Sequence, residues 1–97
     1  MSTTERSQWT FLSNHAHVII YLAQHPEARL RDIADAVGIT ERFAHRIVSE
    51  LEAEGYVSAT RAGRRKTYDV NEQLPFRHPL ERGAHISELL KIFPLVD

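Results

Sequence analysis

The chain has 97 residues, which gives room for one compact domain but not for a second hydrophobic core. Its 42% hydrophobic and 26% charged residues are ordinary for a globular protein and argue against global disorder. The absence of cysteine excludes disulfides and thiolate metal sites, and no apolar run reaches the ~18 residues that would predict a membrane span. Residues 1–8 lack the apolar stretch of a signal peptide, so a cytoplasmic location is expected.

The chain is expected to begin with a flexible arm and a first helix. Residues 1–10 are assigned to the arm, and Trp9 and Phe11 are the first side chains able to bury a large area. Ser13 is a suitable N-cap for a helix that stops before Pro26. Because this helix is apolar on more than one side, one face should cover the next helices. Another should meet a partner chain or the C-terminal segment.

Residues 30–55 carry the pattern of two short helices joined by a tight turn. The first apolar stripe at helical spacing consists of Leu30, Ile33, Ala34 and Val37. Gly38 can then adopt the left-handed conformation that closes a helix, and Thr40 is suited to cap the next one. The second stripe, before Gly55, consists of Ala44, Ile47, Val48 and Leu51. This pattern predicts a helix-turn-helix, whose second helix lies in the DNA major groove.

A β-hairpin is predicted directly after these helices. Its strands are residues 56–61 and 67–70, where apolar and polar side chains alternate, and Ala62 and Gly63 form the turn. A short strand at Arg29 and Leu30 is expected to pair with the hairpin through a single rung of the ladder. The order helix, turn, helix, hairpin is that of a winged helix. The predicted fold is therefore mainly α with a small β-hairpin (α+β), a winged helix-turn-helix over residues 11–72 with terminal helices.

The last segment, residues 73–97, is predicted to be a connector and a short C-terminal helix stopped by Pro94. The apolar stripe of this helix consists of Ile86, Leu89, Leu90 and Phe93. With Leu95 and Val96 beyond it, the stripe is too apolar for a free tail. It packs either on the chain's own first helix or on the same surface of a second copy. The second alternative predicts a homodimer, which could span half-sites about 34–36 Å apart.

The exposed positions of the second helix of the motif are candidate DNA contacts. They are Thr40, Arg42, Phe43, His45 and Arg46. Arg42 or Arg46 can bind guanine O6 and N7 in a two-pronged contact, and Thr40 with the helix start can bind a phosphate. Phe43 either touches a thymine methyl group or folds back onto the first helix of the motif.

The hairpin tip is strongly basic, although the formal net charge of the chain is −1. Its four cations, with no acid among them, are Arg61, Arg64, Arg65 and Lys66. The overall charge argues mildly against nucleic acid, but the distribution of charge matters more. We expect Arg64, Arg65 and Lys66 to contact phosphates or the adjacent minor groove. The alternative is that these cations only protect an exposed strand edge from aggregation.

The remaining polar residues indicate little other chemistry. His85 and Glu88 could share a helical face and, with His78 nearby, bind zinc, but ordinary exposed residues are the simpler interpretation. No metal site and no cofactor is predicted. No nucleophile–base arrangement, Gly-rich phosphate loop or pair of carboxylates is found, so no catalytic residue is assigned and the chain is not expected to be an enzyme.

The chain resembles small bacterial winged-helix transcriptional regulators of the MarR and ArsR type. The stretches that carry the resemblance are residues 30–34, 37–42, 47–57, 63–65, 77–81 and 88–90. The resemblance implies dimerisation through the terminal helices, a third helix in the major groove and a wing along the backbone or minor groove. The contacts it implies are Thr40, Arg42, Phe43, His45, Arg46, Arg64, Arg65 and Lys66. The cysteine ligands of metal-sensing members are absent, and the long helices that frame an effector pocket are largely missing.

The sequence therefore predicts a sequence-specific DNA-binding transcriptional regulator that acts as a homodimer on an operator, with double-stranded DNA as its partner. The small-molecule effector is unknown. One alternative is a metal- or ligand-responsive sensor of the same fold. The other is a protein-interaction module that uses the winged helix to bind another protein and never touches DNA.

Overall fold

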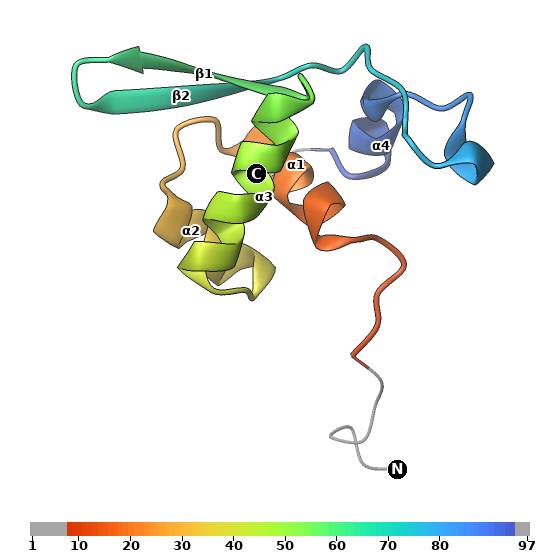
Figure 1. Cartoon of the computed structure of the whole chain (residues 1–97), viewed down its shortest axis with the longest axis horizontal. Coiled ribbons are helices and arrows are strands. Elements are labelled where there is room, and N and C mark those ends of the chain that lie inside the picture. The colour runs from red at the N-terminus through yellow and green to blue at the C-terminus, as the bar shows by residue number, and fades with distance from the viewer. Residues whose placement is uncertain (1–7, 95–97) are drawn as a thin grey trace.

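The computed structural model describes residues 8–94, which contain four α-helices, one 3-10 turn and a two-stranded antiparallel sheet (Figure 1). The elements are α1 (Asn14–Gln24), α2 (Leu30–Val37), α3 (Glu41–Ala53), β1 (Val57–Ala62), β2 (Arg65–Val70), η2 (Pro79–Glu81) and α4 (Ile86–Ile92). Their order confirms the predicted α+β winged helix-turn-helix. None of the helices in this part of the chain is long and apolar enough to cross a membrane. Residues 1–7 of the predicted arm, and Leu95 and Val96, lie outside the described residues.

The tight turn between α2 and α3 forms as the sequence predicts. Gly38 has a φ of +87°, a conformation in which a Cβ atom would cause strain. The amides of Gly38 and Ile39 both donate to the carbonyl of Ala34, at 2.8 and 3.0 Å. Thr40 then caps α3, because its Oγ1 accepts a 3.0 Å hydrogen bond from the amide of Phe43. The relative orientation of α2 and α3 is thus set by local hydrogen bonds.

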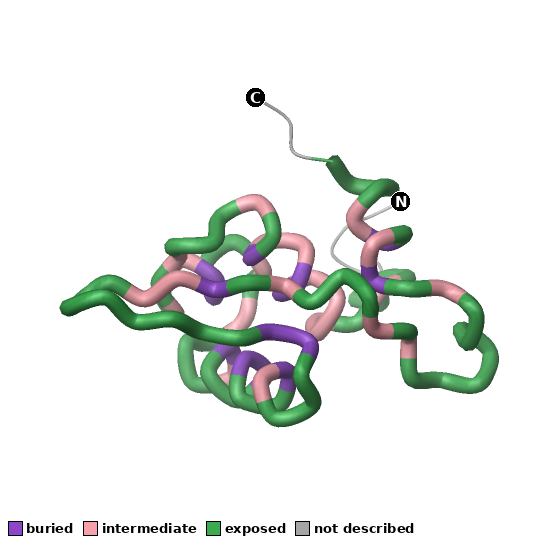
Figure 2. Tube along the Cα trace, turned by 90° about the horizontal axis from the view of Figure 1, so that it is seen from above, coloured by how far each residue is buried: buried purple, intermediate pink, exposed green. Residues whose placement is uncertain are grey.

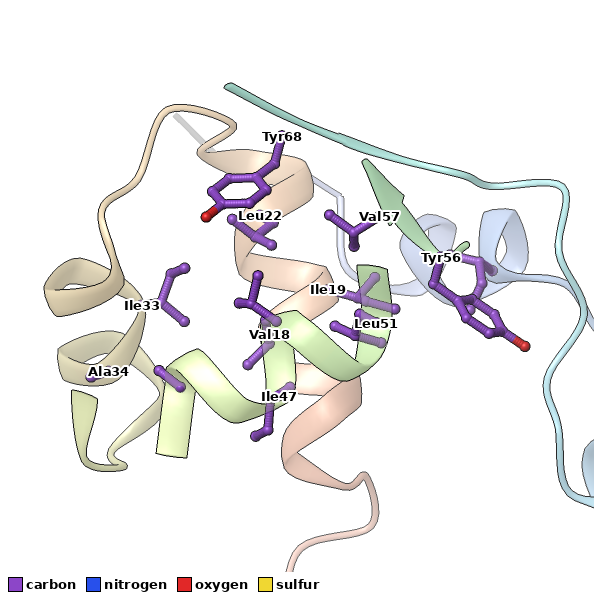
Figure 3. Close-up of a cluster of buried hydrophobic side chains, with 13 residues drawn as sticks. Val18, Ile19, Leu22, Ile33, Ala34, Ile47, Leu51, Tyr56, Val57 and Tyr68 are labelled. Atoms are coloured by element: carbon purple, nitrogen blue, oxygen red, sulfur yellow. The ribbon is translucent and has the colours of Figure 1, made fainter. Parts of the chain in front are cut away.

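The hydrophobic core is shared by the three N-terminal helices, the hairpin and, through Ile86, α4 (Figure 3). Its largest fully buried side chains are Leu22, Ile33, Ile47 and Val18. Tyr68 of β2 lies over α1 and is only 4% exposed, so the hairpin takes part in the core at its base. The apolar stripe predicted for α3 is buried in full, which confirms the sequence pattern. The base of the hairpin is therefore held by packing, whereas its tip projects beyond the helices (Figure 2).

The hairpin is longer than the sequence predicts, and its turn is displaced by one residue. Ala62 pairs with Arg65, so the turn consists of Gly63, with a φ of +63°, and Arg64. The predicted turn at Ala62 and Gly63 is wrong because Ala62 still belongs to the ladder. As predicted, alternate residues of the two strands share one face, on which Val57 and Tyr68 are the buried members.

The extra strand predicted at Arg29 and Leu30 does not form. These residues begin α2, because the carboxylate of Asp32 accepts a 3.0 Å hydrogen bond from the amide of Arg29 and closes a capping box. The backbone contact between this loop and the hairpin comes from an earlier residue. The amide of Tyr68 donates to the carbonyl of Pro26 at 2.8 Å.

The C-terminal segment packs on the chain's own core. Ile86 and Leu89 of α4 are 3% and 4% exposed, and α4 contacts α1. Gln24 of α1 also donates to the carbonyl of Phe93 at 3.2 Å. The prediction that Ile86 and Leu89 form a dimer interface is therefore corrected, because both side chains are already covered within the chain. Leu90 is half-buried, and Phe93 is 42% exposed.

The aromatic residues before α1 are exposed, whereas the sequence predicts that they bury a large area. Trp9 and Phe11 are 65% and 92% exposed, and their rings pack only edge to face, with centroids 5.0 Å apart. The large area that these two side chains are expected to bury is therefore not buried within the single chain. The core instead starts within α1, at Val18.

A core truncation tests this account of packing. Leu22→Ala is expected to lower the free energy of unfolding by about 2–5 kcal/mol, because it leaves a cavity among fully buried side chains. Leu80→Ala removes the same atoms from a side chain that is 90% exposed. It should change the free energy of unfolding by less than about 0.5 kcal/mol. Urea unfolding followed by circular dichroism measures both. Equal effects of the two substitutions would contradict the described core.

The capping box of α2 predicts a pH dependence of stability. The hydrogen bond from the backbone amide of Arg29 holds the pKa of Asp32 below its ordinary value of 3.8. A pKa that is lower in the folded state means that ionised Asp32 stabilises the fold above pH 3.8, and that this contribution is lost as the pH falls through the lowered pKa.

Asp32→Asn is therefore expected to lower the melting temperature slightly at pH 7, and the wild-type and variant curves should converge at acid pH. Asp35→Asn, on the exposed side of the same helix, serves as the control. A difference between wild type and Asp32→Asn that persists at pH 2 would contradict the role of the ionised carboxylate.

Candidate nucleic-acid interface

The exposed face of α3 carries most of the predicted helix contacts. Burial of the apolar stripe turns the opposite side of the helix outward, and Arg42, His45, Arg46 and Ser49 are all exposed. Arg42 forms no ion pair within the described residues. The structure thus places both arginines predicted to read bases on one accessible face of the helix.

Thr40 and Phe43 are joined by the cap at the start of α3, and the two have different surroundings. Thr40 is exposed, and its Oγ1 accepts the cap hydrogen bond, which leaves the hydroxyl proton to donate. Phe43 is half-buried and packs against the core, because it lies on the flank of the helix next to the apolar stripe. The prediction that Phe43 is an exposed DNA contact is therefore corrected. Its side chain supports the start of α3 from inside.

A network of three side chains connects α1 with the exposed face of α3. The Nε2 atom of His15 lies 2.7 Å from Oε1 of Glu50, and the Nε atom of Arg46 lies 3.3 Å from Oε2 of the same carboxylate. These hydrogen bonds, first that of His15 and then that of Arg46, hold the pKa of Glu50 below its ordinary value. The carboxylate therefore accepts from two helices at once.

The wing, defined as the hairpin of residues 57–70, carries four basic side chains in unequal surroundings. Arg64 lies in the turn, and Arg65 forms a 2.7 Å ion pair with Glu27. The Nζ atom of Lys66 lies 5.3 Å from the centroid of the Tyr68 ring. Lys66 is also directly opposite Arg61 in the strand pairing. Two cations facing each other across a sheet are destabilising. The stability of the hairpin therefore does not explain why Arg61 and Lys66 face each other. An anion bound between the two cations would explain it, because it would offset their repulsion.

A groove of about 580 Å³ separates the wing from the start of α2. Six basic residues line it, namely Arg29, Arg31, Arg61, Arg64, Arg65 and Lys66. Only two acids, Glu27 and Glu41, line it with them. Since Glu41 is the first residue of α3, the groove runs from the wing to the start of that helix. The fold thus places most of these basic side chains on one side of the molecule, which is locally positive although the chain has a net charge of −1.

Arg29 and Arg31 are the groove residues that sequence reasoning missed as contacts. They lie about 30 residues before the wing, and only the folding of the hairpin back over the start of α2 brings the two together. The available signal was the pair of arginines around Leu30 at the start of a short helix. Arg29 is oriented by a 3.5 Å contact with Asp32.

The residues considered for zinc have other roles here. The amide of His85 donates to Glu88 at 2.7 Å in a capping box that begins α4. His78 Nδ1 accepts from the amide of Leu80 and caps η2. Among residues 8–94, no three His, Cys, Asp or Glu side chains gather as a metal site requires.

With this geometry established, residues 12–61, more than half of the chain, match the model of the IclR helix-turn-helix domain. The chain belongs to this family. The matched region of this IclR-type domain contains α1, α2, α3 and most of β1, the elements that build the exposed face of α3 and one side of the wing. The match confirms the predicted helix-turn-helix, the type of domain whose second helix lies in the DNA major groove.

Three solved structures illustrate the similarity in fold. ZitR from Lactococcus lactis in complex with DNA has a TM-score of 0.54 and 16% identity, over 68% of this chain and 47% of ZitR. MepR from Staphylococcus aureus has a TM-score of 0.56 and 19% identity, over 93% of this chain and 60% of MepR. PcaV from Streptomyces coelicolor has a TM-score of 0.54 and 22% identity, over 94% of this chain and 65% of PcaV. The chain matches none of the curated proteins.

These likenesses show the winged-helix fold, and the chain spans about half the length of ZitR and less than two thirds of MepR and PcaV. MepR is described as a transcription regulator of a multidrug efflux pump and PcaV as a transcriptional regulator. The resemblance is thus confirmed for the winged helix-turn-helix, whereas the matching family is the IclR helix-turn-helix and not the predicted MarR or ArsR type.

The basic wing predicts a salt-dependent affinity for any duplex. Arg64→Ala should reduce the slope of log K against log salt by about 0.9, because one phosphate contact is lost. The triple variant Arg64→Ala, Arg65→Ala, Lys66→Ala should reduce it by about 2.7. Fluorescence anisotropy with a random-sequence duplex, between about 50 and 200 mM salt, measures the slope. Arg82→Ala, an exposed arginine outside the groove, is the matched control, and a wing variant that behaves like it would refute phosphate contact.

Proposed function

We propose that the chain regulates transcription by binding an operator in double-stranded DNA as a homodimer. The observation that carries this proposal is the basic groove that joins the wing to the start of α3. Glu41, which begins α3, lines the same groove as Arg61 and Arg64. A wing that contacts the backbone beside a helix in the major groove needs such a basic surface next to the start of the helix.

The predicted contact residues other than Phe43 keep their place in this proposal. Arg42 and Arg46 read guanine edges, and His45 lies beside them on the exposed side of α3. Thr40 donates its hydroxyl to a phosphate at the helix start. The phosphate contacts of the wing are Arg64, Arg65 and Lys66. We add Arg29 and Arg31 to the phosphate-facing set, because they line the groove opposite the wing.

The homodimer forms, in this proposal, through apolar side chains that the single chain leaves exposed. Ile92 and Phe93 at the end of α4 are 67% and 42% exposed, and Trp9 and Phe11 before α1 are exposed as well. Leu90, half-buried on α4, completes the set. We retain Leu90 and Phe93 from the sequence prediction and replace Ile86 and Leu89 with Ile92.

Residues 11–72 are proposed as the DNA-reading unit and residues 73–97 as the dimerisation segment, with residues 1–10 as an arm. Within the winged-helix regulators we propose a MarR-like arrangement, since ZitR is described as a MarR family member and MepR and PcaV match most of this chain. The proposed location is the cytoplasm, where the DNA target is.

The two alternative functions receive less support. ZitR is zinc-responsive, but here the His85 and Glu88 pair closes a helix cap and no third ligand lies with it among the described residues. A protein-interaction module that never touches DNA would have no need for two cations placed directly opposite each other in the wing.

Binding-site selection from random duplexes with the purified chain tests the proposed function. The expected result is an enriched inverted repeat, whose half-sites reflect the two-fold symmetry of a dimer. A single enriched half-site would support DNA reading but contradict the homodimer. Absence of enrichment at low salt would contradict DNA reading and favour the interaction module.

A further inference from the structure

Glu50 occupies a position on α3 that helix stability does not explain. It follows Arg46 by four residues, and an acid placed after its basic partner is the less favourable order for such a pair. It also lies in the C-terminal half of α3, where the helix dipole disfavours negative charge. The negative charge beside a DNA-reading face would in addition repel phosphates. These costs indicate a role beyond the stability of the helix.

The contacts of Glu50 determine how Arg46 can be used. The carboxylate binds Nε of Arg46, at 3.3 Å, and leaves the two terminal nitrogens, Nη1 and Nη2. A guanidinium presented end-on in this way has the fork that matches guanine O6 and N7. Glu50 therefore selects one of the two edges with which Arg46 could approach a base.

His15 makes this arrangement more rigid than an isolated surface pair. An exposed ion pair usually contributes little, because two long side chains must be ordered to form it. Here Oε1 of Glu50 is already bound by His15 Nε2, at 2.7 Å, from a different helix. A carboxylate only accepts, so the imidazole carries its proton on Nε2 and donates it. Part of the ordering cost is thus met by the packing of α1 against α3.

We propose that Glu50 is a positioning residue that orients Arg46 for guanine recognition, with His15 as its anchor on α1. The inference rests on the proposed function and deepens it, because it names the residues that make one base position specific. It trades general affinity for selectivity: the carboxylate weakens attraction to any phosphate backbone and strengthens the discrimination of one base.

The test is a parallel selection from one random duplex pool with the wild-type chain and the variants Arg46→Ala, Glu50→Gln, His15→Ala and Glu54→Gln. At one base position the wild type should prefer guanine by about tenfold, the discrimination expected of one good bidentate contact. Arg46→Ala should lose the preference at this position. Glu50→Gln should lose that preference while it keeps the rest of the motif, and His15→Ala should lose part of it. Glu54→Gln removes the same charge one turn later and should keep the full motif.

A second measurement separates positioning from general electrostatics. Affinity for a random-sequence duplex should be equal or higher in Glu50→Gln than in wild type, because a charge that repels phosphates is gone. Guanine discrimination should fall in the same variant. A merely structural role would lower both together.

Several outcomes would overturn the inference. The first is a Glu50→Gln variant that keeps the guanine preference lost in Arg46→Ala. The second is an Arg46→Ala variant that loses no guanine position. The third is a Glu50→Gln variant that loses the whole motif while it remains folded by circular dichroism. If Glu50→Gln does not fold, unchanged guanine preference in His15→Ala refutes the anchor and with it the inference. Failure of wild type itself to enrich any sequence would instead refute the proposed function, and the inference with it.

Discussion

Burial of one face of α3 is the constraint on which the rest of the molecule depends. The four apolar residues of this face lie between the other helices, and Ile47 is completely inaccessible. Rotating α3 would expose several such side chains, at about 1.5–3 kcal/mol for each. The outward direction of Arg42 and Arg46 is therefore set by what the opposite side of the helix buries. The direction of the proposed DNA-reading face is therefore a consequence of the core.

The same packing explains how a chain of net charge −1 presents a basic surface. The hairpin is anchored at its base by Tyr68, whose ring lies in the core and whose amide binds Pro26. That anchor brings the wing over the start of α2, and six basic residues then line one groove with two acids. The acid Glu27 pairs with Arg65 and so orients a cation as well as offsetting its charge. Local charge depends on topology, whereas net charge depends only on composition.

The C-terminal segment serves the core and, in our proposal, a second copy. Ile86 and Leu89 hold α4 on α1, so the helix has a defined place on the domain. The connector is fixed as well, because the hydroxyl of Tyr56 donates to the carbonyl of Pro75 at 2.5 Å. With one side of α4 covered in this way, Ile92 and Phe93 remain on the surface. One side of this short helix thus packs on its own domain, while its C-terminal end leaves apolar side chains exposed.

The sequence by itself determined the elements, their order and the exposed face of α3. Helical stripes, the cap at Thr40 and the turn at Gly38 depend on residues within about four positions of one another, so they can be derived without tertiary structure. Only the tertiary structure decided that Phe43 packs inward and that the C-terminal helix covers its own domain. The same holds for the hydrogen bonds of His15 with Glu50, 35 residues apart, and of Arg65 with Glu27, 38 residues apart. These features depend on where distant segments meet, and local periodicity carries no information about that.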